Sequence, residues 1–395
     1  MANTLTGLIP TIYEALDTVS REMIGFVPAV RKDTDVARAA VNQTVTFPVV
    51  PQGSLESISP AQYPPSTGSQ TIGYDTLSIS KSYAYPVLWN GEEQGGLNNG
   101  DKPQYNNIIR DQFAQAFRTF SSQLDADLAG LYKYASRAYG TAGTTPFATA
   151  SDLSDFAGAR RVLEENGAPT TNLQMVLGSA AIQNLRGKQS VLFKVNEAGT
   201  SDLLRNGAVG SVEGFMIHNS AEVDTHTAGT AASATTDTAG YSVGDTVITL
   251  ASAGTGTILA GDIITFAGDA NKYVVLSGDA DVSGGGTITL AAPGLREAIA
   301  ASATAITVVK DGTSLDYVAN MAFDKNAIVL ATRPPAIPDG GDQADDSMLV
   351  TDPVSGITFE IRQYRMYRQV RTEVCLAWGY KLVKPAHVAI LIGDY

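Results

Sequence analysis

The chain has 395 residues, with 27 Lys and Arg against 40 Asp and Glu, and its formal net charge is -13. Because phosphate neutralisation needs clustered Lys and Arg, this acidity argues against a protein whose main task is to grip nucleic acid. Hydrophobic residues make up 44% of the sequence, which is typical of a globular protein. No run approaches the roughly 18 uncharged apolar residues of a membrane-spanning helix, and at about 100 to 200 residues per domain the length suits two or three domains.

The amino terminus has neither a basic region nor a long apolar stretch, so no secretory signal is expected there. The single cysteine, Cys375, excludes an internal disulfide, and synthesis in a reducing cytoplasm is the expectation. Apolar residues before Pro28 recur at helical spacing, namely Leu5, Leu8, Ile9, Ile12, Leu16, Val19 and Ile24. No partner for this stripe is evident in the chain, which predicts an arm that another copy completes.

Residues 44–88 show no helical period. Strand-like runs at 44–48 and 76–85 enclose a segment rich in Pro, Ser and Gly. This pattern predicts an extended hairpin arm. Such a hairpin has too little apolar surface to fold alone, so we expect it to rest on other structure.

A long amphipathic helix is predicted over residues 106–139. Apolar residues recur there at three- and four-residue steps, and a helix of that length would span roughly 50 Å. Shorter helices are predicted at 152–166 and 179–186, each ending near a glycine.

Residues 223–312 are the most acidic part of the chain, with nine acidic against three basic residues. The segment opens with a run of Thr, Ala, Ser and Gly at 225–240, which predicts a flexible linker. Five short strand-like runs follow, at 246–250, 262–266, 272–276, 287–290 and 305–309. Short strands bounded by turn residues predict a small β barrel or sandwich, inserted into the rest of the chain.

Arginines recur every three residues near the carboxyl end, at Arg362, Arg365, Arg368 and Arg371, with two tyrosines among them. One interpretation is a surface that holds a nucleic-acid strand by charge and stacking. However, an extended strand would point these arginines to alternate faces, so they would not form one stripe. We therefore favour ion pairs with carboxylates, within the chain or across a subunit contact.

No catalytic or metal-binding motif is present. The three histidines, His218, His226 and His387, lie far apart in sequence. Gly187-Lys188 could end a phosphate loop, but the loop's first glycine would have to be at position 182, which is Ile182. The aspartates of the acidic segment lack the spacing of an EF-hand calcium loop. We expect no enzyme activity, no cofactor and no metal site.

Six segments carry a resemblance to a known family: 1–5, 205–217, 243–247, 260–268, 364–367 and 377–381. Together with the order of the elements, they resemble the major capsid proteins of tailed phages. More narrowly, they resemble the P22-type coat proteins, which carry the HK97 fold with an extra β-barrel domain inserted in the A domain.

The resemblance implies an α+β, HK97-like capsid fold with an inserted small β-barrel domain. Its parts would be an N-terminal arm at 1–43, the E-loop hairpin at 44–88, the P domain at 89–151 with its spine helix at 106–139, the A domain at 152–222 and 313–347, the inserted domain at 223–312, and the P-domain return at 348–395.

The function implied is that of a major coat protein. Such a protein self-assembles into the pentamers and hexamers of an icosahedral shell around double-stranded DNA, without sequence-specific binding. The implied partners are further copies of the chain, a scaffolding protein and a portal protein, and no membrane. Assembly would take place in the host bacterial cytoplasm, the product would be the virion capsid, and the shell would expand on maturation. The alternative is a phage tail or adhesin protein with a carbohydrate-binding β domain.

Two sets of residues are candidates for contacts. The subunit-interface candidates are Leu8, Ile12, Leu16, Phe47, Tyr63, Tyr74, Tyr83, Arg362, Arg365, Arg368 and Arg371. The loop candidates of the inserted domain are Asp269, Lys272, Asp279 and Asp281, and residues 267–286 would form a long loop that reaches another copy.

Overall fold

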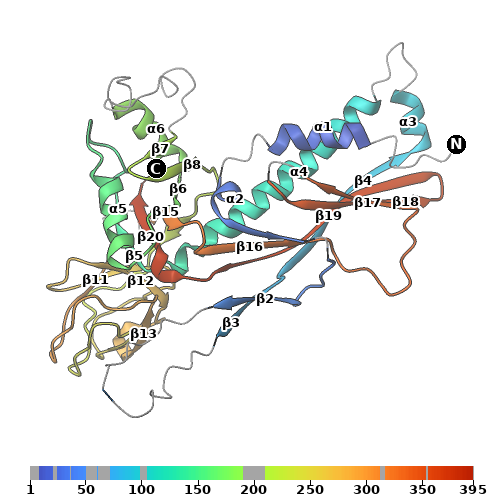
Figure 1. Ribbon diagram of the computed structural model, residues 1–395. Helices are drawn as coiled ribbons and strands as arrows, with labels where there is room; N and C mark the ends of the chain where they lie inside the picture. The colour runs from blue at the N-terminus through green and yellow to red at the C-terminus, as the bar shows by residue number, and fades with distance from the viewer. Residues whose placement is uncertain are drawn as a thin grey trace. The chain divides into compact units, whose positions relative to one another are not determined.

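The structure is a computed structural model of the chain, and it describes residues 9–20, 25–35, 37–49, 60, 72–97, 105–189, 210–311, 316–352 and 355–394. It is a strand-rich mixture of helices and sheets (Figure 1). The α+β class expected from the sequence is therefore confirmed. None of the described helices is long and apolar enough to cross a membrane.

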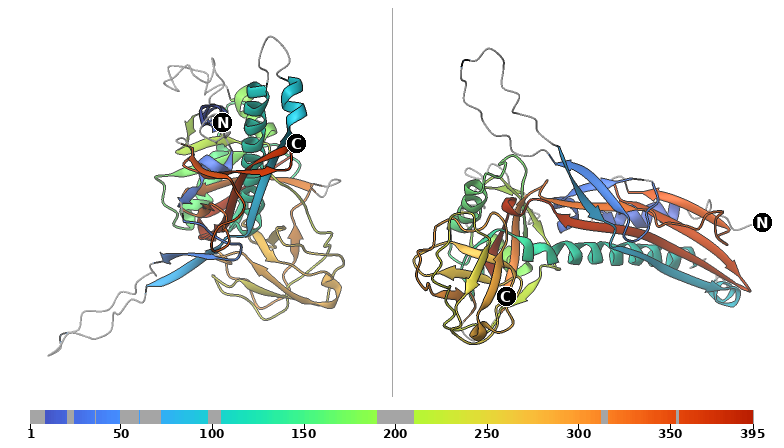
Figure 2. Two further views of the ribbon diagram at one scale, coloured as in Figure 1. Left: turned by 90° about the vertical axis from the view of Figure 1, so that its right-hand side faces the viewer. Right: turned by 90° about the horizontal axis from the view of Figure 1, so that it is seen from below.

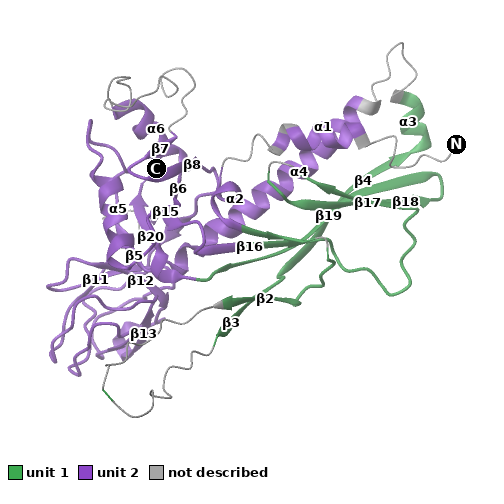
Figure 3. Cartoon of the chain, in the orientation of Figure 1, with its two compact units in different colours: residues 1–9, 32–105, 330–383 green, residues 10–31, 106–329, 384–395 purple. Residues whose placement is uncertain are grey.

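The chain forms two compact units (Figure 3). Unit 1 comprises residues 1–9, 32–105 and 330–383, and unit 2 comprises residues 10–31, 106–329 and 384–395.

Unit 1 is built on a six-stranded sheet whose central strand is β19 (Gln369–Leu382). Its other strands are β1 (Arg31–Thr34), β16 (Ile328–Arg333), β17 (Asp346–Thr351), β18 (Thr358–Met366) and β4 (Lys81–Asn90). The order is β1-β16-β19-β18-β17, and β4 also pairs with β19. A short helix, α3 (Gly91–Leu97), follows β4. Phe359, Val374 and Trp378 are fully buried, because β-branched and aromatic side chains fill the covered face of the sheet.

β18 and β19 form a hairpin that turns at Tyr367 and Arg368. Arg368 has a φ of 57°, the left-handed conformation that such a tight turn uses. The arginine-rich segment is therefore not one extended strand, as the sequence suggested, but two antiparallel strands with Arg368 between them.

The predicted hairpin arm is confirmed in its described part. β2 (Thr44–Val49) and β3 (Gly73–Ser78) pair with each other as a separate two-stranded sheet (Figure 2). The second run differs from the prediction, because β3 ends at Ser78 and β4 begins at Lys81 to pair with β19. Apart from Pro60, the tip of the arm lies outside the described residues.

A close backbone approach holds the base of this arm against β19. A Cβ added to Gly379 would lie 2.1 Å from the Ser78 carbonyl oxygen, so only glycine allows β3 to come this near. Beside it, Lys381 Nζ contacts Asp75 Oδ1 at 2.5 Å and donates to the Thr76 carbonyl at 3.0 Å. Burial pushes the pKa of Asp75 up, but the hydrogen bonds from Lys381 and Thr76 outweigh it and hold that pKa below its usual range.

Unit 2 begins with helices α1 (Ile9–Ser20) and α2 (Phe26–Ala29), followed by the long helix α4 (Tyr105–Ala129). Figure 1 shows α1 beside α4, and Glu14 of α1 pairs with Arg110 of α4 at 3.4 Å. Ile12 and Leu16 are fully buried. The prediction that the N-terminal stripe lacks a partner within the chain is therefore wrong for these two residues.

The long helix is shorter than predicted. It ends at Ala129, which makes it roughly 37 Å long, and a 3₁₀ helix (Gly130–Tyr134) and strand β5 (Arg137–Tyr139) follow. The apolar spacing of the helix continues through Leu131, Tyr132 and Ala135. These residues are buried, but they no longer belong to an α-helix. Glycine at position 130 weakens the helix at the point where the chain turns into the sheet.

A large mixed sheet forms the centre of unit 2. Its strands are β5, β20 (Val388–Gly393), β15 (Asp316–Asp324), β6 (Leu173–Leu177), β8 (Phe215–Asn219) and β7 (Ser211–Val212), in that order, and β9 (Thr225–Thr227) also pairs with β15. The predicted helices are confirmed as α5 (Ser154–Glu165) and α6 (Ser179–Lys188). Phe156, Leu163 and Leu185 of these helices share one core with Met175 and Phe215 of the sheet.

All five predicted strands of the acidic segment are present. They are β10 (Val247–Leu250), β11 (Ile263–Phe266), β12 (Lys272–Ser277), β13 (Gly286–Leu290) and β14 (Ile306–Val308), in the order β10-β13-β12-β11-β14. A second core lies among them, formed by side chains such as Ile248, Ile264 and Ile288. β12 also pairs with β5, so these five strands, called the inserted strands after the expectation from the sequence, continue the central sheet.

The segment 225–240 is not a flexible linker, and this prediction is wrong. Residues 225–227 form β9, and Ala228, Ala231 and Ala234 are buried in the core of the inserted strands. The backbone of 234–237 hydrogen-bonds to residues 304–306 on one side and to residues 249–251 on the other. Small side chains let this extended segment lie close to both outer strands, which composition alone does not reveal.

Candidate functional site

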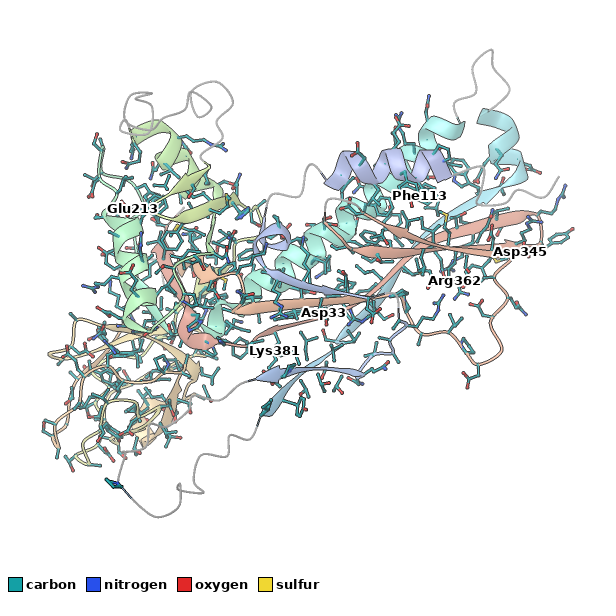
Figure 4. All side chains as sticks on the ribbon, viewed as in Figure 1. Asp33, Phe113, Glu213, Asp345, Arg362 and Lys381 are labelled. Atoms are coloured by element: carbon teal, nitrogen blue, oxygen red, sulfur yellow. The ribbon has the colours of Figure 1, made fainter. Side chains whose placement is uncertain are left out.

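The carboxyl-terminal arginines pair with carboxylates of unit 1. Arg362 contacts Asp342 at 2.6 Å, Arg365 contacts Asp345 at 2.8 Å, and Arg371 contacts Glu373 at 2.9 Å. Figure 4 labels Arg362 and Asp345. The interpretation of these side chains as ion-pair partners within the chain is confirmed for these three. A charge satisfied in this way adds little to phosphate binding, which argues against a nucleic-acid surface here.

Asp342 anchors the connection between β16 and β17 to the sheet. It accepts hydrogen bonds from Arg362, from the Tyr364 hydroxyl at 3.0 Å and from the Ala344 amide at 3.1 Å. Although desolvation raises the pKa of Asp342, these donors and the charge of Arg362 outweigh it, and the pKa lies below its ordinary value.

Glu360 of β18 is buried between two arginines. Its side chain is 1% exposed, and its two oxygens accept hydrogen bonds from Arg38 at 2.6 and 2.8 Å in a bidentate pair. Arg362 Nε lies 3.7 Å from the same carboxylate. The hydrogen bond to Glu360 raises the pKa of Arg38. Sequence reasoning missed this pair because 322 positions separate its members.

The candidate interface residues fall into three groups. Tyr74 and Tyr83 are 74% and 54% exposed, whereas Phe47 is half-buried on the arm. Ile12 and Leu16 are buried within the chain, as described above. Leu8 and Tyr63 lie outside the described residues.

The arm presents two faces with different roles. Val45, Phe47 and Leu77 lie on its more buried face, where Leu77 is fully buried. The opposite face carries the cross-strand pairs Thr46–Thr76 and Pro48–Tyr74, and all four of these residues are exposed. Exposed aromatic side chains are enriched at protein–protein interfaces.

The four loop candidates of the acidic segment all make hydrogen bonds within unit 2. Asp269 accepts hydrogen bonds from Tyr273 and Asn271, Asp279 accepts one from the Asp281 amide, and Asp281 accepts one from the Ser283 amide. Lys272 donates to the Gly140 carbonyl, and burial lowers the pKa of Lys272. Residues 267–286 are not one long loop, because they contain β12.

The three histidines lie in different surroundings within unit 2. His218 bonds Gln174 at 2.9 Å, and His387 lies in a 3₁₀ helix (Pro385–His387), where burial lowers its pKa. His226 lies between Tyr132 and Asp262, and all three side chains are buried. Within the described ranges, no cluster of three or more His, Cys, Asp or Glu could hold a metal ion.

No family model matches the sequence, and no curated protein matches it. Among solved structures, the chain is similar to one from "Asymmetric unit of bacteriophage PhiM1 mature capsid", with 12% identity, a TM-score of 0.44 and coverage of 93% of this chain and 86% of that one. It is also similar to one from "Capsid structure of the Cyanophage P-SCSP1u", with 11% identity, a TM-score of 0.43 and coverage of 91% and 85%.

A third similar chain comes from "Capsid of native GTA particle computed with C5 symmetry", with 9% identity, a TM-score of 0.43 and coverage of 94% of this chain and 91% of that chain. At identities and TM-scores this low, these likenesses assign neither a fold nor a function to the chain.

Proposed function

We propose that the chain is a capsid protein, a structural subunit that assembles with many copies of itself into the shell of a tailed phage. The observation that carries this proposal is the two-stranded arm formed by β2 and β3. One of its faces includes the buried Leu77, which lies against β19 of the same unit, and the other is exposed and carries Tyr74. Two-stranded hairpins are marginal alone, so an arm with one open face is suited to lie on a neighbouring subunit.

The finer parts of the proposal follow from the resemblance of the sequence to P22-type coat proteins. They are the HK97-like division into an N-terminal arm, E-loop, P domain and A domain, the closure of the inserted strands into a small barrel, and the pentamers and hexamers of an icosahedral shell. Scaffolding and portal proteins would be partners, and the shell would enclose double-stranded DNA and expand on maturation.

The charge balance supports a container rather than a DNA-binding protein. The chain has 40 acidic against 27 basic residues, and three of the four carboxyl-terminal arginines are paired with carboxylates. A wall that must release its DNA should not bind phosphates tightly, because each contact adds salt-dependent affinity.

Replacing Tyr74 with serine tests the arm as a subunit contact. Because Tyr74 is 74% exposed, the substitution should leave the free energy of unfolding unchanged within about 0.5 kcal/mol. Loss of an aromatic anchor from an interface typically costs about 2 kcal/mol or more, so the concentration needed for assembly should rise by at least about tenfold. Sedimentation velocity over a concentration series measures the assembled fraction.

Tyr74→Phe is the matched control, since it keeps the ring and should assemble like the wild type. Deleting residues 2–28 is a poorer test, because Ile12 and Leu16 are buried within the chain and their removal would also disturb folding. Wild-type assembly by Tyr74→Ser at every concentration would show that this face of the arm makes no subunit contact.

A further inference from the structure

Three buried polar side chains meet where the inserted strands join the rest of unit 2. Tyr132 comes from the 3₁₀ helix after α4, His226 from β9, and Asp262 from the residue before β11. The Tyr132 hydroxyl lies 2.8 Å from His226 Nδ1, and His226 Nε2 lies 2.7 Å from Asp262 Oδ1. Asp262 is 0% exposed, and the other two side chains are buried.

The backbone around Asp262 supplies two further donors. Asp262 accepts from the Leu259 amide at 2.7 Å and from the Gly229 amide at 3.0 and 3.1 Å. A proton on His226 Nε2, donated to Asp262, makes Nδ1 the acceptor for the Tyr132 hydroxyl, and this one tautomer accounts for both contacts. Burial raises the pKa of Tyr132, so its hydroxyl keeps the proton that it donates.

The residues around Tyr132, His226 and Asp262 pack closely against these three side chains. The Tyr317 hydroxyl of β15 donates to the Gly261 carbonyl at 2.6 Å, and the Tyr317 ring lies 5.1 Å from the His226 ring. A Cβ added to Gly229 would lie 2.3 Å from the Thr257 carbonyl oxygen, and one added to Gly261 would lie 2.9 Å from His226 Cε1. The network is thus closely packed as well as hydrogen-bonded.

A second attachment lies at β12. Tyr273 and Lys272 of β12 pair with Arg137 and Ala138 of β5, and Arg137 donates to Asn271 at 2.7 Å. β5 follows the 3₁₀ helix that carries Tyr132, so both attachments reach the same short stretch of chain after α4.

We propose that the Tyr132–His226–Asp262 network is a latch that makes the inserted strands and the stretch 130–139 open as one cooperative unit. Breaking the latch while these three side chains stay buried would leave a carboxylate and two ring groups without hydrogen-bond partners, so opening at Asp262 alone is costly unless the whole contact opens to water. Movement of the inserted strands is therefore transmitted to the end of α4. This inference does not depend on the proposed capsid function.

Hydrogen exchange followed by mass spectrometry on the full chain tests the latch. Tyr132→Phe removes one hydroxyl and keeps the ring, and Asp262→Asn removes the charge and keeps the shape. We expect exchange about tenfold faster than in the wild type, both around residues 226–231 and 257–264 and in residues 130–139 and 272–275. His218→Gln, at a half-exposed histidine bonded to Gln174, is the control and should change neither region.

Faster exchange confined to the neighbourhood of the substituted side chain would overturn the proposal, and so would an equal effect of His218→Gln. If Asp262→Asn does not accumulate as a folded chain, Tyr132→Phe decides the question alone, because its ring still packs 5.6 Å from the His226 ring.

Discussion

Replacing Glu360 with alanine is expected to lower the free energy of unfolding of the chain by about 2 to 3 kcal/mol. The carboxylate is 1% exposed and holds Arg38 by two hydrogen bonds, with Arg362 Nε at 3.7 Å. Without Glu360, the Arg38 guanidinium loses its bidentate partner but keeps the Pro335 carbonyl at 2.8 Å, and Arg362 loses one of its two neighbouring carboxylates. The Arg38 side chain is 32% exposed and regains water, so most of the cost comes from the less exposed Arg362 and from the space that the Glu360 side chain leaves. Urea unfolding of the unassembled chain measures the change.

Asp345→Ala is the matched control, because it removes a carboxylate from an arginine pair on the same sheet. Asp345 and Arg365 are both exposed, so the loss should be no more than about 1 kcal/mol. Replacing Glu360, Arg38 and Arg362 together by apolar residues of similar volume should recover much of the stability, since no buried charge then remains. Equal losses for Glu360→Ala and Asp345→Ala would contradict this interpretation of the cluster.

Replacing Arg137 with alanine should cost about 3 to 5 kcal/mol, this time in unit 2. Arg137 is 1% exposed and binds Glu165 at 2.9 Å, Asn271 at 2.7 Å and Asn166 at 3.0 Å, and it also donates to the Val162 carbonyl at 3.2 Å. The substitution would leave several acceptors without their donor and a cavity in a packed region. Thermal unfolding followed by circular dichroism measures the loss.

Arg161 provides the control for this second experiment. It contacts the same carboxylate, Glu165, at 3.5 Å, but its side chain is 61% exposed. Arg161→Ala should therefore change the stability by less than about 1 kcal/mol. If the two substitutions destabilise the chain equally, burial of Arg137 is not the source of its contribution.

Local patterns predicted most of the elements. The helices α5 and α6 and the five inserted strands follow from periodicity and turn residues, because each depends on neighbours in sequence. The end of α4 could not be found this way, since Leu131, Tyr132 and Ala135 remain buried at helical spacing after the helix has ended. What ends the helix is pairing of β5 with β20, which lies some 250 positions away (Ala389 with Arg137).

In the segment 225–240, too, the local sequence did not reveal pairing with distant residues. Its composition suggested flexibility, yet Thr235 and Thr236 bridge to Ala305 and Leu250. The segment is rich in small and β-branched residues. Such a composition is compatible with a closely packed extended strand as well as with a linker. Because the segment was assigned to a linker, His226 was not recognised as a buried network residue.

The candidate contact residues were predicted only in part. The expectation that the arginines pair with carboxylates is confirmed for Arg362, Arg365 and Arg371, because Arg is favoured for such pairs. Their partners Asp342 and Asp345 lie in a connection that only the folded sheet brings near, and Arg38 reaches Glu360 across most of the sequence. Contacts of this kind carry no periodic signal.

Electron microscopy of the purified full chain, over a range of concentrations, is the most direct test of the proposed capsid function. We expect rings or closed shells built from many copies, with the exposed face of the β2–β3 arm at a contact between subunits. A chain that remains a compact monomer at high concentration, with and without a scaffolding protein, would contradict the proposal.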